Sequence, residues 1–357
     1  MGLSFLLVAG LGVSPTGSPA RDWHEASYYE KLDRGNVRCR LCPRGCIIPP
    51  GTRGVCRVRE NRGGTLYSVV YGRPCSMSRE PIEKAPFFHF LSGSSRLCIA
   101  TPGCNQSCKY CQNWEISQRP PEDLFFRDMP PESVVALAKE IGTPIICFTF
   151  SEPVVFFEYM CDIARLARRA GIRTAVVTGG YINPEPLREL CGLVDAIKID
   201  LKGFTDDFYR NVCGSSLKPV LEACRVVAGS GTHLELVNLV VPALNDDSAE
   251  IRRMCQWIAW NLGDTVPIHF TRFGPAYRMG NSPPTPIPTL EQAAGIADRA
   301  GLRYVFVGNV PGHEREDTFC PECGRVVIDR QAYTIVAREL EDGKCRFCET
   351  RISGVWD

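Results

Sequence analysis

Three cysteines in the middle of the chain have the spacing of an iron–sulfur site. Cys104, Cys108 and Cys111 form the pattern CxxxCxxC within TPGCNQSCKYCQNWEISQ, directly after a short apolar segment. A [4Fe–4S] cube normally takes four thiolate ligands. Three ligands leave one iron open, and an open metal position is what the binding of a substrate requires. The alternative is a zinc ion or structural cluster that finds its fourth ligand elsewhere in the chain.

Two further cysteine groups flank this motif. Near the C-terminus, two CxxC pairs separated by 21 residues predict a zinc ribbon, with a second cluster as the other possibility because thiolates bind both metals. Near the N-terminus, four cysteines and several surrounding arginines predict either a zinc site or an auxiliary iron–sulfur cluster, which spacing alone does not separate. The C-terminal ligands are Cys320, Cys323, Cys345 and Cys348, and the N-terminal ligands are Cys39, Cys42, Cys46 and Cys56.

Most of the other cysteines among the 19 in the chain stand alone within apolar or helical segments. An isolated free cysteine packs as a small hydrophobic side chain, so we expect these to be buried core residues. They are Cys98, Cys147, Cys161, Cys191, Cys213, Cys224 and Cys255. Cys75 has no predicted role.

The elements that position the central motif alternate between apolar strands and amphipathic helices. Helices are expected over Pro131–Ile141 and Phe156–Ala170, where apolar residues recur at helical spacing. The expected strands are Arg96–Ala100, Ile145–Phe150, Arg173–Thr178, Ala196–Ile199, Leu234–Val241, Pro267–Phe270 and Tyr304–Val307. This α/β pattern predicts a partial or complete (β/α) barrel of the TIM type, with its active site at the carboxyl ends of the strands. The motif at Cys104 follows the first of these strands, which favours a catalytic cluster.

The chain of 357 residues divides into four segments by composition. Residues 1–20 resemble the apolar part of a signal sequence but lack a preceding basic residue, so they are a possible leader, and the cytoplasm is the expected location. Residues 30–95 form a cysteine-rich extension, 96–312 the barrel, and 313–357 a metal-binding module without room for its own core. The formal net charge of +1 argues against a nucleic-acid partner, and the apolar run at the N-terminus is too short for a membrane span.

The motif CxxxCxxC with an aromatic residue before its last cysteine, Tyr110, resembles that of the radical S-adenosylmethionine (SAM) enzymes. The resemblance implies that the open iron chelates SAM. One electron then releases a 5′-deoxyadenosyl radical, which abstracts hydrogen from a substrate. It further implies SAM contacts in loops after later strands: Ser151 and Glu152 in TFSEP, Thr178 in VTGGYI, Lys202 in KIDLKG, and Val241 and Asn245 in LVVPALND. Asp200, also in KIDLKG, would lie beside the site of the radical.

Some of these matches are incomplete. The superfamily usually has Gly-Gly-Glu where this chain has Phe-Ser-Glu, and Thr-Asn-Gly where this chain has Thr-Gly-Gly, so Gly179 lacks a side chain to contact ribose. A surface ion pair at a strand end is the structural alternative for the acidic and basic residues of the fourth strand. That alternative is stronger for Asp195 and Lys198 than for Asp200 and Lys202.

Segments across the chain, among them CRLCPRGC, EPIEKAPFFHF, HFTRFGPAYRM and YVFVGNVPGHE, are similar to the AmmeMemoRadiSam-system radical SAM enzymes, relatives of the pyruvate formate-lyase activating enzymes. This resemblance implies a low-potential electron donor of the flavodoxin or ferredoxin type and partners of the AMMECR and Memo types. At the substrate end, Arg272 is our preferred contact, ahead of His269, for which a buried histidine with its own partners is the alternative. A non-enzymatic iron–sulfur scaffold or electron carrier is the main alternative, but such a protein needs no array like Glu152, Asp200 and Lys202.

Overall fold

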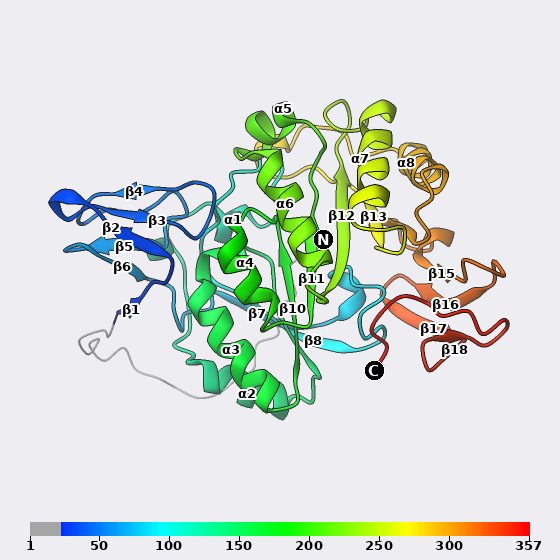
Figure 1. The fold of residues 1–357 in the computed structure, drawn as a ribbon, viewed down its shortest axis with the longest axis horizontal. Coiled ribbons are helices and arrows are strands. Elements are labelled where there is room, and N and C mark those ends of the chain that lie inside the picture. Colours follow the sequence, from blue (N-terminus) through cyan, green and yellow to red (C-terminus); the bar gives the residue numbers. More distant parts are fainter. Residues whose placement is uncertain (1–22) are drawn as a thin grey trace.

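An eight-stranded sheet forms the centre of the computed structural model, which describes residues 23–357; the possible leader lies outside the described residues (Figure 1). Its strands are β7 (Ser76–Pro81), β8 (Ser95–Ala100), β9 (Ile145–Phe148), β10 (Arg173–Thr178), β11 (Ala196–Asp200), β12 (His233–Val240), β13 (Ile268–Arg272) and β14 (Val305–Gly308).

The strands follow one another across the sheet in the order of the sequence, from β7 at one edge to β14 at the other. Strands β8 to β14 are parallel, and β7 is antiparallel to β8. Sequential parallel strands with helical crossovers are the winding of a (β/α) barrel. Because the two edge strands are not hydrogen-bonded to each other, the barrel is partial, which confirms the predicted fold class.

Helices on the outside of the sheet cover its strands (Figure 1). The two predicted helices are present as α2 (Pro131–Glu140) and α3 (Phe157–Arg169), and α3 buries an apolar face that includes Met160, Ile163 and Ala167. The other helices are α1 (Trp114–Ser117), α4 (Pro184–Cys191), α5 (Asp206–Phe208), α6 (Leu217–Ala228), α7 (Ser248–Asn261) and α8 (Ile287–Arg299), with a π-turn, η5, at Tyr209–Cys213. None of the helices in residues 23–357 is long and apolar enough to cross a bilayer.

A segment between β7 and β8 closes the amino-terminal end of the barrel. Ile82, Phe87 and Phe90 of this segment pack against small side chains of the sheet such as Ala175 and Ala196. Glu235 of β12 is fully buried beside them and accepts backbone N–H groups from Phe88 and His89 at 3.0 and 2.8 Å. Since one end of the barrel is filled, the carboxyl end is the open one.

The two cysteine-rich extensions lie at opposite ends of the long axis (Figure 1). The N-terminal one contains two small sheets, formed by β1 (His24–Glu25), β5 (Arg59–Arg62) and β6 (Thr65–Ser68), and by β2 (Tyr29–Lys31), β3 (Val37–Cys39) and β4 (Ile47–Ile48). The C-terminal one contains β15 (Thr318–Phe319), β16 (Val326–Gln331), β17 (Thr334–Arg338), β18 (Leu340–Glu341) and β19 (Lys344–Cys345).

The C-terminal module shares its core with the barrel rather than building one alone. Ile328 and Trp356 of the module cluster with Phe88 and Phe306 of the barrel. Arg330 of the module is 4% exposed, and its Nη2 donates to the carbonyl of Phe88 at 2.8 Å. The core shared with the barrel stabilises a module that is too small to form a hydrophobic core of its own.

Candidate active site

The loop after β8 carries Cys104, Cys108 and Cys111 at the open end of the barrel. The backbone N–H groups of Ser107 and Lys109 donate to the carbonyls of Cys213 and Val212, both at 2.9 Å. These bonds attach the loop to the π-turn η5, so its three cysteines are held in a fixed position. Cys108 is buried, and Cys104 and Cys111 are partly buried.

These thiols fit a cubane cluster better than a single ion. Within residues 23–357, only the C-terminal cysteine quartet brings three or more ligand atoms to within 4.8 Å of one another. The thiols of Cys104, Cys108 and Cys111 are therefore more widely spread, as ligands on different corners of a cube must be. Burial raises the pKa of Cys104 well above its usual value, so a metal that replaces the thiol protons is needed for these side chains to be thiolates.

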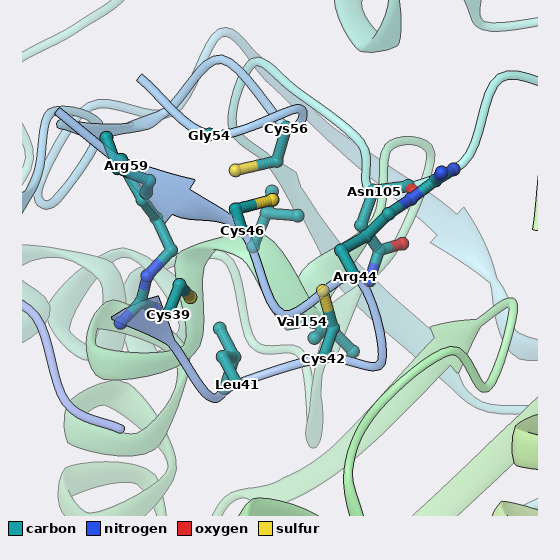
Figure 2. Close-up of a pocket in the computed structure, with 12 residues that line it drawn as sticks. Cys39, Leu41, Cys42, Arg44, Cys46, Gly54, Cys56, Arg59, Asn105 and Val154 are labelled. Carbon is teal, nitrogen blue, oxygen red and sulfur yellow. The ribbon is translucent and has the colours of Figure 1, made fainter. Parts of the chain in front are cut away.

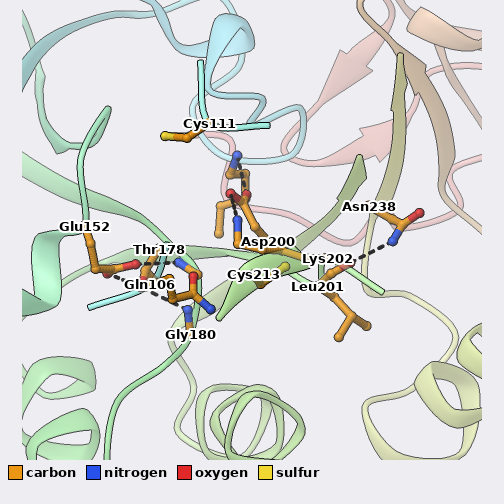
Figure 3. Close-up of polar contacts among 12 residues, drawn as sticks. Gln106, Cys111, Glu152, Thr178, Gly180, Asp200, Leu201, Lys202, Cys213 and Asn238 are labelled. Atoms are coloured by element: carbon orange, nitrogen blue, oxygen red, sulfur yellow. Dashed lines mark hydrogen bonds and ion pairs between the residues drawn. The ribbon is translucent and has the colours of Figure 1, made fainter. Parts of the chain in front are cut away.

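Glu152 follows β9 and forms a buried hydrogen-bond cluster with the end of β10 (Figure 3). Thr178 Oγ1 donates to its Oε1 at 2.6 Å, and the N–H of Gly179 donates to its Oε2 at 2.9 Å. Burial raises the pKa of Glu152, although these donors act in the opposite direction. Ser151, next to it, has a buried Oγ without a partner among the described residues, which leaves a donor and acceptor available to a ligand.

Gly179 has a structural reason to be glycine. A Cβ at this position would collide with the side-chain Oε1 of Gln106 and would lie 3.3 Å from Glu152 Oε2. Gln106 is two residues after Cys104, and its Nε2 donates to Ser215 Oγ at 2.9 Å. A side chain at residue 179 would therefore require Gln106 to move, so the contact between β10 and the cysteine loop favours glycine over the asparagine of Thr-Asn-Gly.

Asp200 and Lys202 lie at the carboxyl end of β11, close to the cysteine loop (Figure 3). Lys202 Nζ is 3.2 Å from Asp200 Oδ2, and Lys198 Nζ is 3.1 Å from Asp200 Oδ1. Burial alone would lower the pKa of Lys202, but Asp200 and the thiol of Cys108 raise it well above its usual value. Lys202 is thus a protonated cation beside the cluster loop.

A surface ion pair was the stronger alternative for both Asp195 and Lys198, but only Asp195 forms one. Asp195 does form a half-exposed ion pair, with Arg173 at 3.0 Å. Lys198 is only 4% exposed and donates to the carbonyl of Ala85 at 2.7 Å inside the barrel, so the surface interpretation of Lys198 is wrong. The difference arises because alternate residues of a barrel strand face the interior, and Lys198 shares that side with Asp200.

Val241 and Asn245 follow β12 and are buried at the same end. Asn245 Oδ1 accepts the N–H of Val241 at 2.6 Å, and its Nδ2 donates to the carbonyl of Lys202 at 2.7 Å. The amide of Asn245 therefore connects two loops of the site and holds the backbone of Lys202.

Arg272 ends β13 at the open end of the barrel, whereas His269 lies deeper. Arg272 Nε donates to the carbonyl of Thr285 at 2.9 Å, and in residues 23–357 its guanidinium makes no salt bridge. His269 is fully buried and its Nε2 is 2.7 Å from Glu235 Oε2, as expected for a buried histidine with its own partner. Beyond Arg272, Tyr277 stacks on Trp114, which follows the cysteine loop, with ring centroids 5.2 Å apart.

The sequence analysis missed one residue at the site. Cys213 is fully buried, as expected of all seven isolated cysteines, but it lies beside Cys108 and its Sγ is 3.7 Å from the hydroxyl of Tyr110. Cys213 belongs to no spacing pattern, and only the path of η5 across the open end brings it to the cluster loop.

The C-terminal quartet has the geometry of a single-metal site. The four sulfurs all lie within 4.8 Å, with Cys320 and Cys348 at 3.5 Å and Cys323 and Cys345 at 3.8 Å. Around a tetrahedral zinc ion with Zn–S bonds of about 2.3 Å, sulfurs lie about 3.8 Å apart. The quartet therefore fits a zinc-ribbon-like module. The N-terminal cysteines Cys39, Cys42, Cys46 and Cys56 line one cavity, described below.

Comparisons with known proteins match the part of the chain that carries these residues. The model of the Radical SAM superfamily matches residues 98–255, which include the three cysteines of the loop after β8. An uncharacterized protein of Methanocaldococcus jannaschii is 45% identical over 330 residues, 92% of this chain and 98% of that protein. The pyruvate formate-lyase 1-activating enzyme of Escherichia coli is 23% identical over 222 residues, 57% of this chain and 89% of that enzyme.

Among solved structures, a radical SAM methyltransferase from Sphaerobacter thermophilus aligns with a TM-score of 0.48 and 16% sequence identity, over 65% of this chain and 70% of that one. The residues matched by the superfamily model run from within β8 to within α7 and include the loop with Cys104, Cys108 and Cys111. The chain belongs to the radical SAM superfamily, and it is related to the pyruvate formate-lyase activating enzymes.

Proposed function

We propose that this protein cleaves SAM reductively and uses the resulting radical to abstract hydrogen from a substrate, in the manner of an activating enzyme. The observation that carries the proposal is the convergence of three features on one barrel end: the three cysteines of the loop after β8, the cation Lys202, and the buried side chain of Glu152. Cys104, Cys108 and Cys111 would hold a [4Fe–4S] cluster with one open iron, and this cluster would supply the electron for reductive cleavage of SAM to methionine and a 5′-deoxyadenosyl radical.

In this proposal, Lys202 binds the carboxylate of SAM, because it is the protonated side chain next to the cluster loop. Ser151 and Glu152 bind its amino group, and the open Oγ of Ser151 is suited to that contact. The segment from Thr178 to Gly180 borders the ribose, and Val241 and Asn245 border the adenine side. Asp200 holds the ammonium group of Lys202 in place and lies beside the position of hydrogen abstraction.

Arg272 is the substrate contact in this proposal. It has no acidic partner in the described part of the chain, so a carboxylate or phosphate on the substrate would satisfy its free N–H groups. The stacked rings of Trp114 and Tyr277 connect the segment after the cysteine loop to the segment after Arg272. A flavodoxin- or ferredoxin-type donor and partners of the AMMECR and Memo types remain part of the proposal through the resemblance to that system.

The test is anaerobic reconstitution with iron and sulfide, followed by dithionite and SAM, with 5′-deoxyadenosine measured by chromatography. We expect the wild-type protein to form it and Cys108→Ala to form none. If a fully loaded wild-type protein yields no 5′-deoxyadenosine with reductant and SAM in excess, the proposal fails, and an electron carrier or scaffold becomes the better explanation.

A further inference from the structure

Four cysteines of the N-terminal extension surround one cavity (Figure 2). Cys39 ends β3, Cys42 and Cys46 lie in the loop between β3 and β4, and Cys56 precedes β5. Cys39 and Cys56 are buried, and Cys42 and Cys46 are partly exposed. The rest of the lining is mostly apolar and includes Leu41, Ile48, Val154 and Val155.

The spread of these thiols differs from that of the C-terminal quartet. In the described part of the chain, no three of Cys39, Cys42, Cys46 and Cys56 have sulfurs within 4.8 Å of one another, whereas the four C-terminal sulfurs all do. One tetrahedral ion requires its thiolates to be about 3.8 Å apart. Thiolates on separate corners of a cube lie farther apart, because several iron and sulfide atoms stand between them. The wider arrangement matches a cluster.

A buried guanidinium at the cavity has an unused donor. Arg59 is 2% exposed, its Nη1 is 3.0 Å from Glu158 Oε1, and its Nη2 donates to the carbonyl of Ser27. Its Nε has no partner among the described residues, although Arg59 lines the cavity beside Cys39 (Figure 2). A buried N–H without a partner is costly, and a thiolate-ligated anion in the cavity would accept it.

The cavity shares a wall with the catalytic cysteine loop. Asn105, which follows Cys104, lines the cavity, and Arg44 Nε donates to the carbonyl of Asn105 at 2.9 Å. On the other side of Cys104, a Cβ on Gly103 would lie 2.7 Å from the carbonyl oxygen of Cys56. The two cysteine groups are thus in direct backbone contact.

We propose that Cys39, Cys42, Cys46 and Cys56 hold a second [4Fe–4S] cluster, beside the one on the loop after β8. Four protein thiolates leave no open iron, so this cluster binds no SAM. The neighbouring positions of the two loops place the clusters close enough for their unpaired electrons to interact magnetically. The inference goes beyond the proposed function and does not depend on SAM cleavage.

The experiment removes the first cluster and counts what remains. The full-length triple variant Cys104→Ala/Cys108→Ala/Cys111→Ala is purified and reconstituted anaerobically, and its iron, sulfide and zinc are measured. We expect about four irons and four sulfides to remain, with a paramagnetic signal after dithionite reduction. Adding Cys39→Ala and Cys42→Ala should abolish the remaining iron, whereas adding Cys320→Ala and Cys323→Ala should leave it unchanged.

A measurement on the wild-type protein covers the case in which these variants do not fold. Its Mössbauer spectrum should contain two equal cluster populations, of which SAM changes only one. After full reduction, the electron paramagnetic resonance spectrum should be broadened relative to the triple variant. A triple variant that holds zinc and no iron, or a wild-type protein with one cluster population, would overturn the inference. Two populations that are both insensitive to SAM would support it while contradicting the proposed function.

Discussion

Lys202 combines burial, a fixed partner and a positive charge next to the cluster loop. Its Nζ is 3.2 Å from Asp200 Oδ2, and Asp200 keeps a second cation, Lys198, when Lys202 is removed. The substitution Lys202→Ala therefore removes a ligand contact without leaving the carboxylate of Asp200 unpaired.

We predict that Lys202→Ala weakens SAM binding by about 10- to 100-fold, the loss expected for one charge-assisted hydrogen bond. Binding is measured by anaerobic titration of the cluster spectrum with SAM, at equal iron content. The control is Lys139→Ala, since Lys139 is exposed on α2, and it should leave the affinity unchanged. Equal affinities for both variants would contradict the assignment of Lys202 to SAM.

A site residue could be predicted from the sequence when the residues that act with it are close to it in the chain. Cys104, Cys108 and Cys111 were predictable because a cluster needs closely spaced thiolates on one loop. Cys213 was not predictable, because an isolated cysteine has no spacing pattern that distinguishes a core residue from a residue beside a cluster. Lys198 was misplaced because the interior of this barrel is polar, and a charged residue at a strand end suggests the surface.

At the level of elements, the contact between the cysteine loop and the N-terminal extension depends on Gly103. This residue has a φ of +102° and lies against the carbonyl of Cys56 and the side chain of Val58. A side chain at residue 103 would be unfavourable for two reasons. L-residues rarely adopt this φ, and the carbonyl group of Cys56, as part of the backbone, cannot easily move away from a Cβ.

We predict that Gly103→Ala destabilises the protein by about 2 to 4 kcal/mol and lowers its iron content, because the two loops must separate. Gly231→Ala is the matched control: its φ is +81°, nothing lies within 4 Å of its Cβ position, and a loss of only about 1 kcal/mol is expected. Urea unfolding and iron analysis measure both effects. A Gly103→Ala variant no worse than its control would show that the loops are not held in contact.

The seven parallel strands of the barrel were predictable to within about two residues because each is short, mostly buried and rich in apolar residues, even where one or two polar side chains interrupt it. The antiparallel strand β7 was missed, since its sequence, Ser-Met-Ser-Arg-Glu-Pro, has no apolar alternation and is only partly buried. Its place at the edge of the sheet comes from pairing with β8, and pairing of this kind leaves no local signal in the sequence.

On the scale of the whole molecule, the junction between the barrel and the C-terminal module contains titratable groups. His89 is fully buried, and its Nδ1 lies 2.6 Å from the carbonyl of Ser353 in the module. Burial lowers the pKa of His89 to about 3, although the charge of Glu235 opposes this shift. Burial lowers the pKa of His269 as well.

We predict that stability falls as the pH is lowered below about 6.5. In the unfolded chain, His89 has a pKa of about 6.5, so between that pH and about 3 the unfolded state binds more protons than the folded state. His89 alone should cost about 1 kcal/mol between pH 6.5 and 5.5. Urea unfolding at these pH values measures the slope, and His89→Gln, which keeps a donor without titrating, should reduce it. An unchanged slope in that variant would exclude His89 as the cause.

The closure of the barrel's amino-terminal end has a consequence for biosynthesis. The backbone N–H of Leu91 donates to the carbonyl of Val355 at 2.7 Å, and the backbone N–H of Val355 donates to the carbonyl of His89 at 2.8 Å. The side-chain bond from His89 to Ser353 joins residues 264 positions apart. Residue 355 must therefore leave the ribosome before these last bonds to the segment can form, and until then the segment is held only by contacts with barrel residues such as Ala175, Ala196 and Glu235. Contacts of such separation form slowly and leave intermediates exposed to aggregation and proteases.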